Sequence, residues 1–259
     1  MKTRTIKCNF ENSRGLILDA RLDLPAPYEE GDVLTFIVYC HCFTCSKETI
    51  TSHRISRMLA ERGFGVLRFD FSGLGDSEGE FATTTFRSMR DDLGSAISFL
   101  KKNYRAPHYL VGHSFGGTTA LAIAQATGCI DGVVTIASPF QPAHVLHHLD
   151  DSSIGLLEKD MPSSFEVAGQ LFDIDPEFVH DVRAYDMKTR LAELGKPVLI
   201  INIENDDVVE EENSRQIQKY IMGESVLVDI ENSDHMLTDR VSSEKVTNLI
   251  NDWIKTTFG

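Results

Sequence analysis

The feature that most constrains this chain is a serine placed between two glycines, where an apolar run ends. Residues 109–117 read Tyr-Leu-Val-Gly-His-Ser-Phe-Gly-Gly, and a helix-forming segment follows at residues 118–124. In this Gly-x-Ser-x-Gly pattern, Ser114 lies at a sharp turn between a strand and a helix, and Gly112 and Gly116 lack the Cβ atoms that would collide there. The strand before and the helix after favour a nucleophilic serine over a chance Gly/Ser-rich turn.

The hydrophobic pattern around this turn predicts a mostly parallel sheet. Residues 6–10 and 18–24 alternate apolar and polar side chains about a turn, which indicates an antiparallel hairpin with one wet face. Beyond them, nearly continuous apolar runs alternate with helical segments, which is typical of buried parallel strands with helices on both faces. The expected strands lie at residues 33–40, 65–70, 109–111, 132–137, 197–201 and 226–230, and one of the expected helices at 216–222.

One interval breaks this alternation. About sixty residues separate the strands that end near Ala137 and begin near Pro197, far more than an ordinary crossover needs. The interval carries a helical segment at residues 142–149, a hairpin turning at Ala168-Gly169, and a helix opened by Asp175-Pro176. We therefore expect a cap at residues 139–190, inserted between core segments 1–138 and 191–259.

A serine nucleophile needs a base, and the base needs an acid that orients it. When the serine follows a parallel strand in this way, the acid and then the histidine follow later in the chain, each in a loop after a strand. Asp206 and Asp207 come just after the strand near residue 201, and His235 follows the last strand. Either aspartate fits the role of the acid, and an incidental pair of loop residues is the plainer alternative.

Composition limits the partners. The 259 residues carry a formal net charge of −14 without a compensating Lys/Arg cluster, which disfavours nucleic acid and strongly anionic substrates. The N-terminus has no apolar segment typical of a signal peptide, and no run of eighteen apolar residues predicts a membrane span. Five cysteines, an odd number, suit reduced thiols in the cytoplasm. We expect a cytoplasmic monomer or homodimer that binds a small-molecule acyl substrate and needs no cofactor.

Taken together, these segments resemble the α/β-hydrolase superfamily, of the serine-esterase and serine-aminopeptidase-like type, over essentially the whole chain. The resemblance rests on four segments: His-Cys-Phe-Thr at residues 41–44, Asp-x-x-Gly-x-Gly-x-Ser at 70–77, the turn at 112–116 and the strand with its acid at 198–209. The run at residues 41–47, together with 138–145, is similar to the hydrolase half of bacterial hydrolase–OsmC fusion proteins. Because the chain ends at its closing helix, we expect that half alone.

The resemblance implies the roles of the site residues. The register of the acid segment selects Asp206 over Asp207. Ser114 is then the nucleophile, His235 the base and Asp206 the acid, while the backbone N–H groups of Phe43 and Phe115 form the oxyanion hole. The function implied is a serine hydrolase of carboxylic esters or similar acyl compounds, with no metal. Peptidase, thioesterase, lactonase and acyltransferase activities share this triad, and a non-catalytic binding module on the same fold is the remaining alternative.

Two other patterns have plainer explanations. The glycines at residues 73–79 are spaced Gly-x-Gly-x-x-x-Gly, which differs from the dinucleotide fingerprint. Cys40, Cys42 and Cys45 are too closely spaced for a zinc site without a second ligand pair, so we expect buried thiols beside the active site. His144, His147 and His148 are expected to be solvated or at the edge of the core rather than metal ligands.

Overall fold

A computed structural model describes residues 2–27 and 33–258. An eight-stranded sheet runs through the molecule in the order β1-β2-β4-β3-β5-β6-β9-β10. β1 and β2 form an antiparallel hairpin, β2 joins β4 antiparallel, and all later pairs are parallel. The strands are β1 (Lys2–Glu11), β2 (Ile17–Ala26), β3 (Phe36–Cys40), β4 (Gly65–Phe69), β5 (Pro107–His113), β6 (Gly132–Ile136), β9 (Val198–Ile203) and β10 (Ser225–Ile230).

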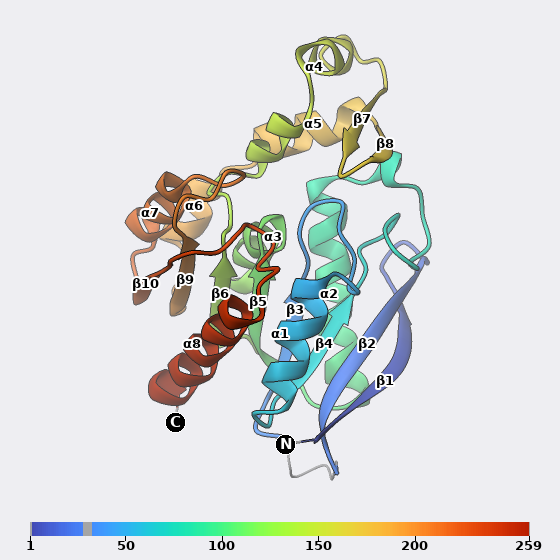
Figure 1. The fold of residues 1–259 in the computed structure, drawn as a ribbon. Coiled ribbons are helices and arrows are strands. Elements are labelled where there is room, and N and C mark those ends of the chain that lie inside the picture. The colour runs from blue at the N-terminus through green and yellow to red at the C-terminus, as the bar shows by residue number, and fades with distance from the viewer. Residues whose placement is uncertain (1, 28–32, 259) are drawn as a thin grey trace.

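Helices cover both faces of the sheet (Figure 1). α1 and α8 lie on one face, and α2, α3 and α7 on the other. The strands serve both layers because successive side chains point to opposite faces: in β3, Ile37 and Tyr39 join the core under α1 and α8, while Val38 and Cys40 join the other. These helices are α1 (Ile50–Ala60), α2 (Phe86–Asn103), α3 (Phe115–Ala124), α7 (Glu211–Tyr220) and α8 (Arg240–Phe258).

The chain between β6 and β9 adds a layer above the carboxyl ends of the parallel strands, at the top of Figure 1. Its hairpin turns at Ala168 and Gly169, both at positive φ, as the sequence predicts. The Asp175 N–H donates to the carbonyl of Ala82 at 3.2 Å, which ties this layer to the 3₁₀ helix η1 (Phe81–Thr83). The elements of this layer are η2 (Pro142–His148), α4 (Asp151–Leu157), β7 (Ser163–Val167), β8 (Gln170–Ile174) and α5 (Pro176–Ala184). The short helix α6 (Met187–Ala192) follows and lies beside α3 and α7 (Figure 1).

One helix begins and ends earlier than the sequence predicts. The sequence pattern predicts a helix at residues 216–222, whereas α7 spans Glu211–Tyr220 and the chain leaves the helix at Ile221. The first turn carries Glu211 and Glu212, which interact favourably with the helix dipole, but it presents no apolar stripe to reveal a helix. Among the described residues, no helix has the length and the apolar character needed to cross a bilayer.

Candidate active site

Ser114 stands at the end of β5, where the chain turns into α3. Its backbone has φ 52° and ψ −127°, a strained conformation for a residue with a side chain. The flanking glycines make the turn possible. A Cβ on Gly112 would lie 2.3 Å from the Gly117 nitrogen, and a Cβ on Gly116 would lie 2.3 Å from the Cys40 carbonyl oxygen. The Ser114 N–H donates to the Ile136 carbonyl at 2.8 Å, which fixes the turn to β6.

Asp206 and His235 meet at the same edge of the sheet, from the loops after β9 and β10. The His235 Nδ1 lies 2.7 Å from the Asp206 Oδ2. The Asp206 Oδ1 accepts the N–H groups of Val208 at 2.8 Å and Val209 at 3.1 Å. Burial opposes ionisation of Asp206, but the hydrogen bonds from His235 and from these two N–H groups outweigh it and lower the pKa of the carboxyl. Asp207 is exposed.

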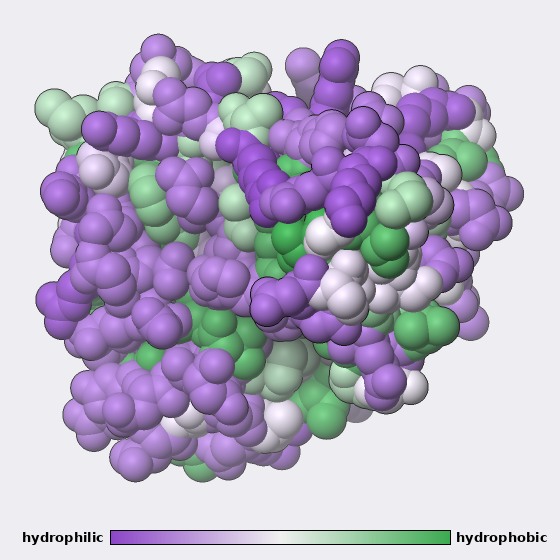
Figure 2. Space-filling model, turned by 90° about the horizontal axis from the view of Figure 1, so that it is seen from above, coloured by the Kyte–Doolittle hydropathy of each residue, from purple (hydrophilic) through white to green (hydrophobic). Residues whose placement is uncertain are grey.

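A cavity of about 570 Å³ brings Ser114 and His235 together. Its lining is largely apolar and includes the loop after β3, the β7–β8 hairpin and the loop after β10. Because Asp206 holds the Nδ1 of His235, the Nε2 is the nitrogen left for Ser114. The lining residues are Cys42, Phe43, Thr44, Cys45, Thr49, Ser114, His148, Val167, Ala168, Gln170, Asp207, Val208, Asp234, His235, Met236 and Thr238. Seen from the cap side, hydrophobic surface shows between hydrophilic side chains (Figure 2).

The two residues expected to form the oxyanion hole are in contact. The Phe43 and Phe115 rings meet edge to face, with centroids 5.5 Å apart. Phe115 is the first residue of α3, so its N–H has no acceptor within the helix. Phe43 also stacks on Phe165 of β7 at 5.8 Å and on His148 of η2 at 6.1 Å. Phe43 therefore joins the loop after β3 both to the turn at Ser114 and to the layer above it.

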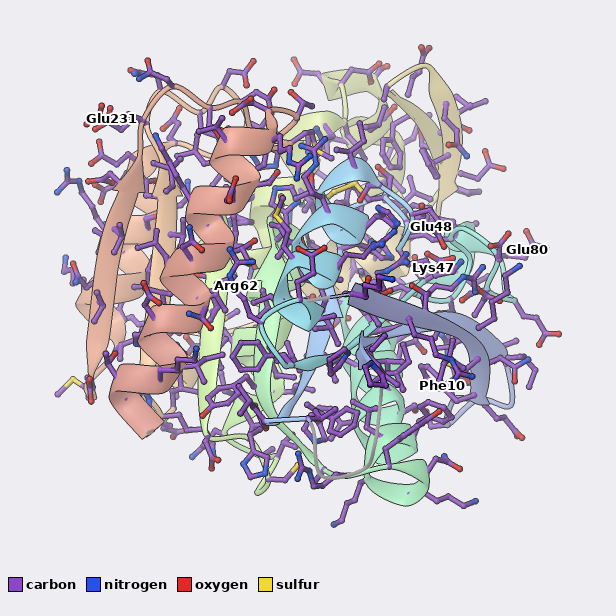
Figure 3. The ribbon with its side chains drawn as sticks, turned by 60° about the horizontal axis from the view of Figure 1, so that its bottom comes forward. Phe10, Lys47, Glu48, Arg62, Glu80 and Glu231 are labelled. Carbon is purple, nitrogen blue, oxygen red and sulfur yellow. A yellow bond between two sulfur atoms is a disulfide. The ribbon has the colours of Figure 1, made fainter. Side chains whose placement is uncertain are left out.

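A buried ionic network, which the sequence analysis missed, holds the other end of that loop. The Lys47 Nζ lies 2.6 Å from the Asp70 Oδ2, 2.8 Å from the Asp19 Oδ1 and 2.9 Å from the Asp76 Oδ2. The Lys47 N–H also donates to the Asp70 Oδ1 at 2.6 Å. Burial alone would lower the pKa of Lys47, but these carboxylates raise it. The labels in Figure 3 locate Lys47 beside Glu48.

The same three aspartates resemble a metal site by spacing. Their oxygen atoms lie within 4.8 Å of one another. The Lys47 ammonium is hydrogen-bonded among them, so the chain supplies the compensating positive charge itself. The Asp-x-x-Gly-x-Gly-x-Ser segment was a usable signal for Asp70 and Asp76, but nothing in the sequence paired them with Lys47.

The expectation of reduced cysteines is wrong for one pair. Cys42 and Cys45 form a disulfide, with Cα atoms 5.3 Å apart, whereas Cys40 is a free, buried thiol (the bond is yellow in Figure 3). The Cys45 N–H donates to the Cys42 carbonyl at 3.3 Å, and this tight turn brings the two side chains within the range that a disulfide spans. An odd cysteine count indicates that one thiol is left over, but it does not exclude a local pair.

A neighbouring cavity of about 510 Å³ shares His148, Asp207 and Val208 with the first. Its remaining lining includes His144 and the carboxylates of Glu210 and Glu212. Burial, followed by the nearby histidines, lowers the pKa of His144 to about 4, so its imidazole is neutral at pH 7. No lysine or arginine lines either cavity among the described residues, so both favour neutral or cationic groups over anions.

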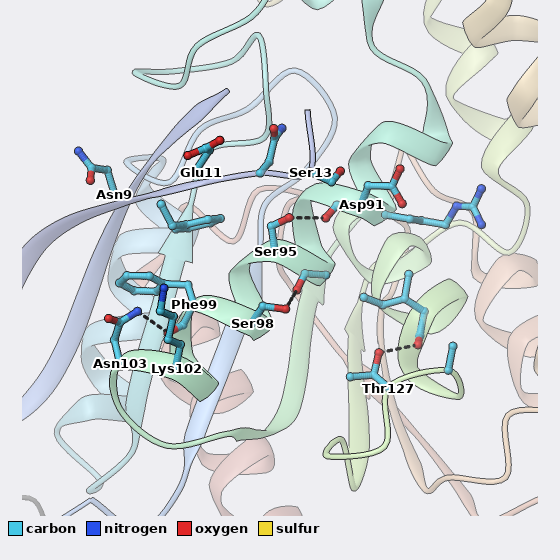
Figure 4. Close-up of a pocket in the computed structure, with 16 residues that line it drawn as sticks. Asn9, Glu11, Ser13, Asp91, Ser95, Ser98, Phe99, Lys102, Asn103 and Thr127 are labelled. Atoms are coloured by element: carbon cyan, nitrogen blue, oxygen red, sulfur yellow. Dashed lines mark hydrogen bonds between the residues drawn. The ribbon is translucent and has the colours of Figure 1, made fainter. Parts of the chain in front are cut away.

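A larger cavity lies elsewhere and lacks such chemistry. It has a volume of about 810 Å³ and lies between β1, α2 and the end of α3 (Figure 4). Its serines bond within their own helix: Ser95 donates to the Asp91 carbonyl and Ser98 to the Gly94 carbonyl, both at 2.9 Å. Both hydroxyls are thus engaged by backbone carbonyls of α2, and neither Ser114 nor His235 lines this cavity.

Comparison with known proteins agrees with the fold described above. The family model described as serine aminopeptidase, S33, matches residues 35–171, just over half of the chain. The crystal structure of the esterase domain from a Rhodothermus marinus protein is 31% identical, covers 99% of both chains and has a TM-score of 0.78. Est1E from Butyrivibrio proteoclasticus, solved with ferulic acid, is 21% identical over 96% of this chain and 98% of its own, with a TM-score of 0.82, and shows the same fold.

A curated relative is the human palmitoyl-protein thioesterase ABHD10, mitochondrial. It is 24% identical over 203 residues, which cover 74% of this chain. The match spans less than two thirds, 64%, of the human protein. The parallel sheet, the strand–serine–helix turn and the family match lead to one assignment: the chain belongs to the serine aminopeptidase S33 family of α/β-hydrolases.

Proposed function

We propose that this α/β-hydrolase cleaves a carboxylic ester, or a similar small acyl compound, through an acyl-enzyme on Ser114. The observation that carries the proposal is the 2.7 Å contact of Asp206 with His235, the histidine that lines one cavity together with Ser114. Asp206 fixes the ring and stabilises the imidazolium, so the Nε2 of His235 accepts the Ser114 proton during attack on the acyl carbonyl.

The oxyanion is then stabilised by the N–H groups of Phe43 and Phe115. Such preorganised donors contribute about 3–4 kcal/mol each to the lowering of a barrier. His235 returns its proton to the leaving group, and a water molecule, activated by the same histidine, hydrolyses the acyl-enzyme. Residues 139–190 act as a cap in this scheme, because His148, Val167 and Ala168 supply one wall of the cavity.

The test compares two serines in different cavities. Wild-type protein should hydrolyse p-nitrophenyl acetate and react with a fluorophosphonate probe at Ser114. We expect Ser114→Ala to lose about 10⁴-fold or more in kcat and all labelling, since it removes the nucleophile. Ser98→Ala, in the cavity of Figure 4, is the matched control and should retain both. Full turnover by Ser114→Ala would refute the mechanism, and a folded wild type that neither turns over nor labels would favour a binding module.

A thioester is the second candidate substrate. Its support is the name of the curated relative, a palmitoyl-protein thioesterase, together with the apolar lining of the cavity here. Acyl esters and acyl thioesters of matched chain length, from two to sixteen carbons, should be compared by kcat/KM. A preference for long-chain thioesters would select the second candidate, whereas a preference for short or aryl esters would select the first. The cytoplasmic location and the oligomeric state remain predictions.

A further inference from the structure

The Cys42–Cys45 disulfide lies in the wall of the catalytic cavity. Both half-cystines line that cavity together with Ser114 and His235. Cys42 is 4% exposed, whereas Cys45 is partly exposed. A small molecule that enters the cavity can therefore reach the sulfur of Cys45 from the substrate side.

The disulfide encloses a strained residue. Thr44, between the two cysteines, has φ 55°, an unusual conformation for a β-branched side chain. Such a conformation persists only where its surroundings impose it. The constraints here are the disulfide, the Cys45 N–H bond to the Cys42 carbonyl, and the Thr44 hydroxyl bond to the Phe43 carbonyl at 2.7 Å. Opening the disulfide would remove the covalent constraint and let Thr44 relax. This would rotate the peptide units on either side of Thr44, one of which joins it to Phe43.

Movement of Phe43 would reach two parts of the site. Its N–H is one of the two proposed oxyanion donors, and its ring contacts Phe115, which supplies the other. The same ring stacks on Phe165 and His148 of the layer above the cavity, with interplanar angles of 11° and 13°. The state of the disulfide is thereby coupled to the oxyanion hole and to the cavity wall.

The free cysteines of the chain are poorly placed to exchange with this bond. Cys40 is fully buried, and burial raises the pKa of its thiol far above the usual value, so it carries no thiolate. Burial also raises the pKa of Cys8, on β1, to about 11. Cys129 lies in the loop before β6, and neither Cys8 nor Cys129 lines the catalytic cavity. The attacking thiol must therefore come from solution.

We propose that Cys42–Cys45 is a thiol–disulfide exchange site, reached by small thiols through the catalytic cavity, and that its reduction slows hydrolysis. The second clause rests on the proposed function; the first does not. A thiolate attacks the Cys45 sulfur, the disulfide breaks, and Cys42 leaves as a thiolate that takes up a proton. A second thiol attacks the mixed disulfide, releasing the small-molecule disulfide and the Cys45 thiolate. Two thiols are oxidised, and the protein disulfide is reduced by two electrons.

Exchange is measured first, without reference to turnover. Ser114→Ala and wild type are treated with 2-mercaptoethanol, quenched with iodoacetamide and analysed by peptide mass spectrometry. Both should show alkylated Cys42 and Cys45 in the folded protein. In wild type previously labelled with a fluorophosphonate on Ser114, thiol–disulfide exchange should be at least about fivefold slower, because access controls the rate of exchange. Alkylation only under unfolding conditions would overturn the first clause, and equal rates with and without the label would overturn the route through the cavity.

Turnover is measured next on the same preparations. Reduction should lower kcat for p-nitrophenyl acetate by about tenfold or more, as for a misplaced oxyanion donor, and diamide should restore it. The matched control Cys8→Ser/Cys129→Ser should respond like wild type. Cys42→Ala/Cys45→Ala should have the low kcat of reduced wild type, and neither the thiol nor diamide should change it. Equal kcat for protein shown by mass to be reduced and oxidised would overturn the second clause. A wild type inactive in both states would instead count against the proposed function.

Discussion

The Nε2 atom of His113 lies 2.8 Å from the backbone carbonyl oxygen of His235. The residue immediately before the proposed nucleophile therefore holds the main chain of the proposed base. Burial, followed by the nearby charge of His235, lowers the pKa of His113 to about 3, so the ring stays neutral and its Nε2–H donates to that carbonyl. The loop after β10 is fixed in part from inside the turn that presents Ser114.

The buried, neutral ring of His113 predicts an acid-labile contribution to stability. Between about pH 3 and the ordinary histidine pKa near 6.5, the unfolded chain binds a proton that the folded protein excludes from His113. The free energy of unfolding should fall as the pH drops through this window, by up to about 1.4 kcal/mol per pH unit from this group. His113→Gln should flatten the slope of urea midpoints measured from pH 7 to pH 4. The exposed His180→Gln should keep the wild-type slope; an unchanged slope in His113→Gln would count against the assignment.

Adjacent aspartates provide a matched test of the acid. Asp206→Asn should lower kcat by about 10²- to 10⁴-fold, because an amide cannot stabilise the imidazolium or enforce the productive tautomer. Asp207→Asn should change kcat far less than Asp206→Asn, because Asp207 is an exposed residue of the cavity wall, whereas Asp206 is the carboxylate that lies 2.7 Å from the His235 Nδ1. Steady-state kinetics on one ester compare the two variants, and equal losses would show that Asp206 has no special role.

Two glycine-to-alanine substitutions should change the free energy of unfolding in opposite directions. A methyl group on Gly112 would lie 2.3–2.4 Å from backbone atoms of Gly116 and Gly117, so Gly112→Ala should displace the turn and lower both stability and kcat. A methyl group on Gly94, inside α2, would meet nothing within 4 Å. Gly94→Ala should therefore raise the free energy of unfolding by about 0.5–1 kcal/mol through a less flexible unfolded chain. Denaturant titration measures both, and a stable, active Gly112→Ala would contradict the packing argument.

Removing the buried ammonium should be costly. Lys47→Met leaves Asp70 buried without its counter-charge, and breaking one partner of a buried ion pair costs about 3–5 kcal/mol. Asp70 also accepts the backbone N–H of residue 47, at the end of the loop that carries Phe43. If Asp70 shifts after losing the ammonium, this loop shifts with it, so kcat should fall as well. Lys255→Met, on the exposed side of α8, is the control and should stay within about 0.5 kcal/mol of wild type. Similar stabilities for both variants would show that the network contributes little.

The architecture was readable where local chemistry is distinctive. Buried parallel strands can be recognised as apolar runs in the sequence. The glycines around Ser114 indicate a turn that residues with a Cβ atom cannot adopt. His235 and the pair Asp206 and Asp207 could be selected because each follows a strand, and the family resemblance chose Asp206 from the pair. The structure places Asp206 within hydrogen-bonding distance of His235. Their catalytic roles, like the limits of the cap, remain predictions.

The features that could not be predicted from the sequence depend on residues distant in the chain or have only weak local signals. The ion pairs of Lys47 with Asp19 and Asp70 need β2 beside β4 and β4 beside β3, an order that periodicity cannot give. The disulfide depends on the turn that joins Cys42 to Cys45 rather than on the number of cysteines. The first turns of α7 are polar, so that helix was placed too late.

The N-terminal hairpin has a consequence for how small a working version of this protein can be. Asp19 on β2 bonds to Lys47, and Asp23 on the same strand bonds to Arg68 at 2.8 Å, whose guanidinium in turn donates to the Lys47 carbonyl. The segment matched by the family model starts at residue 35, after this hairpin. Trimming the chain to that point would remove one counter-ion from each of two buried cations beneath the loop that carries Phe43, leaving Lys47 with Asp70 and Asp76, and Arg68 with Glu48. The hairpin thus contributes to the charge balance under that loop, and a minimal version of this protein should begin ahead of Asp19.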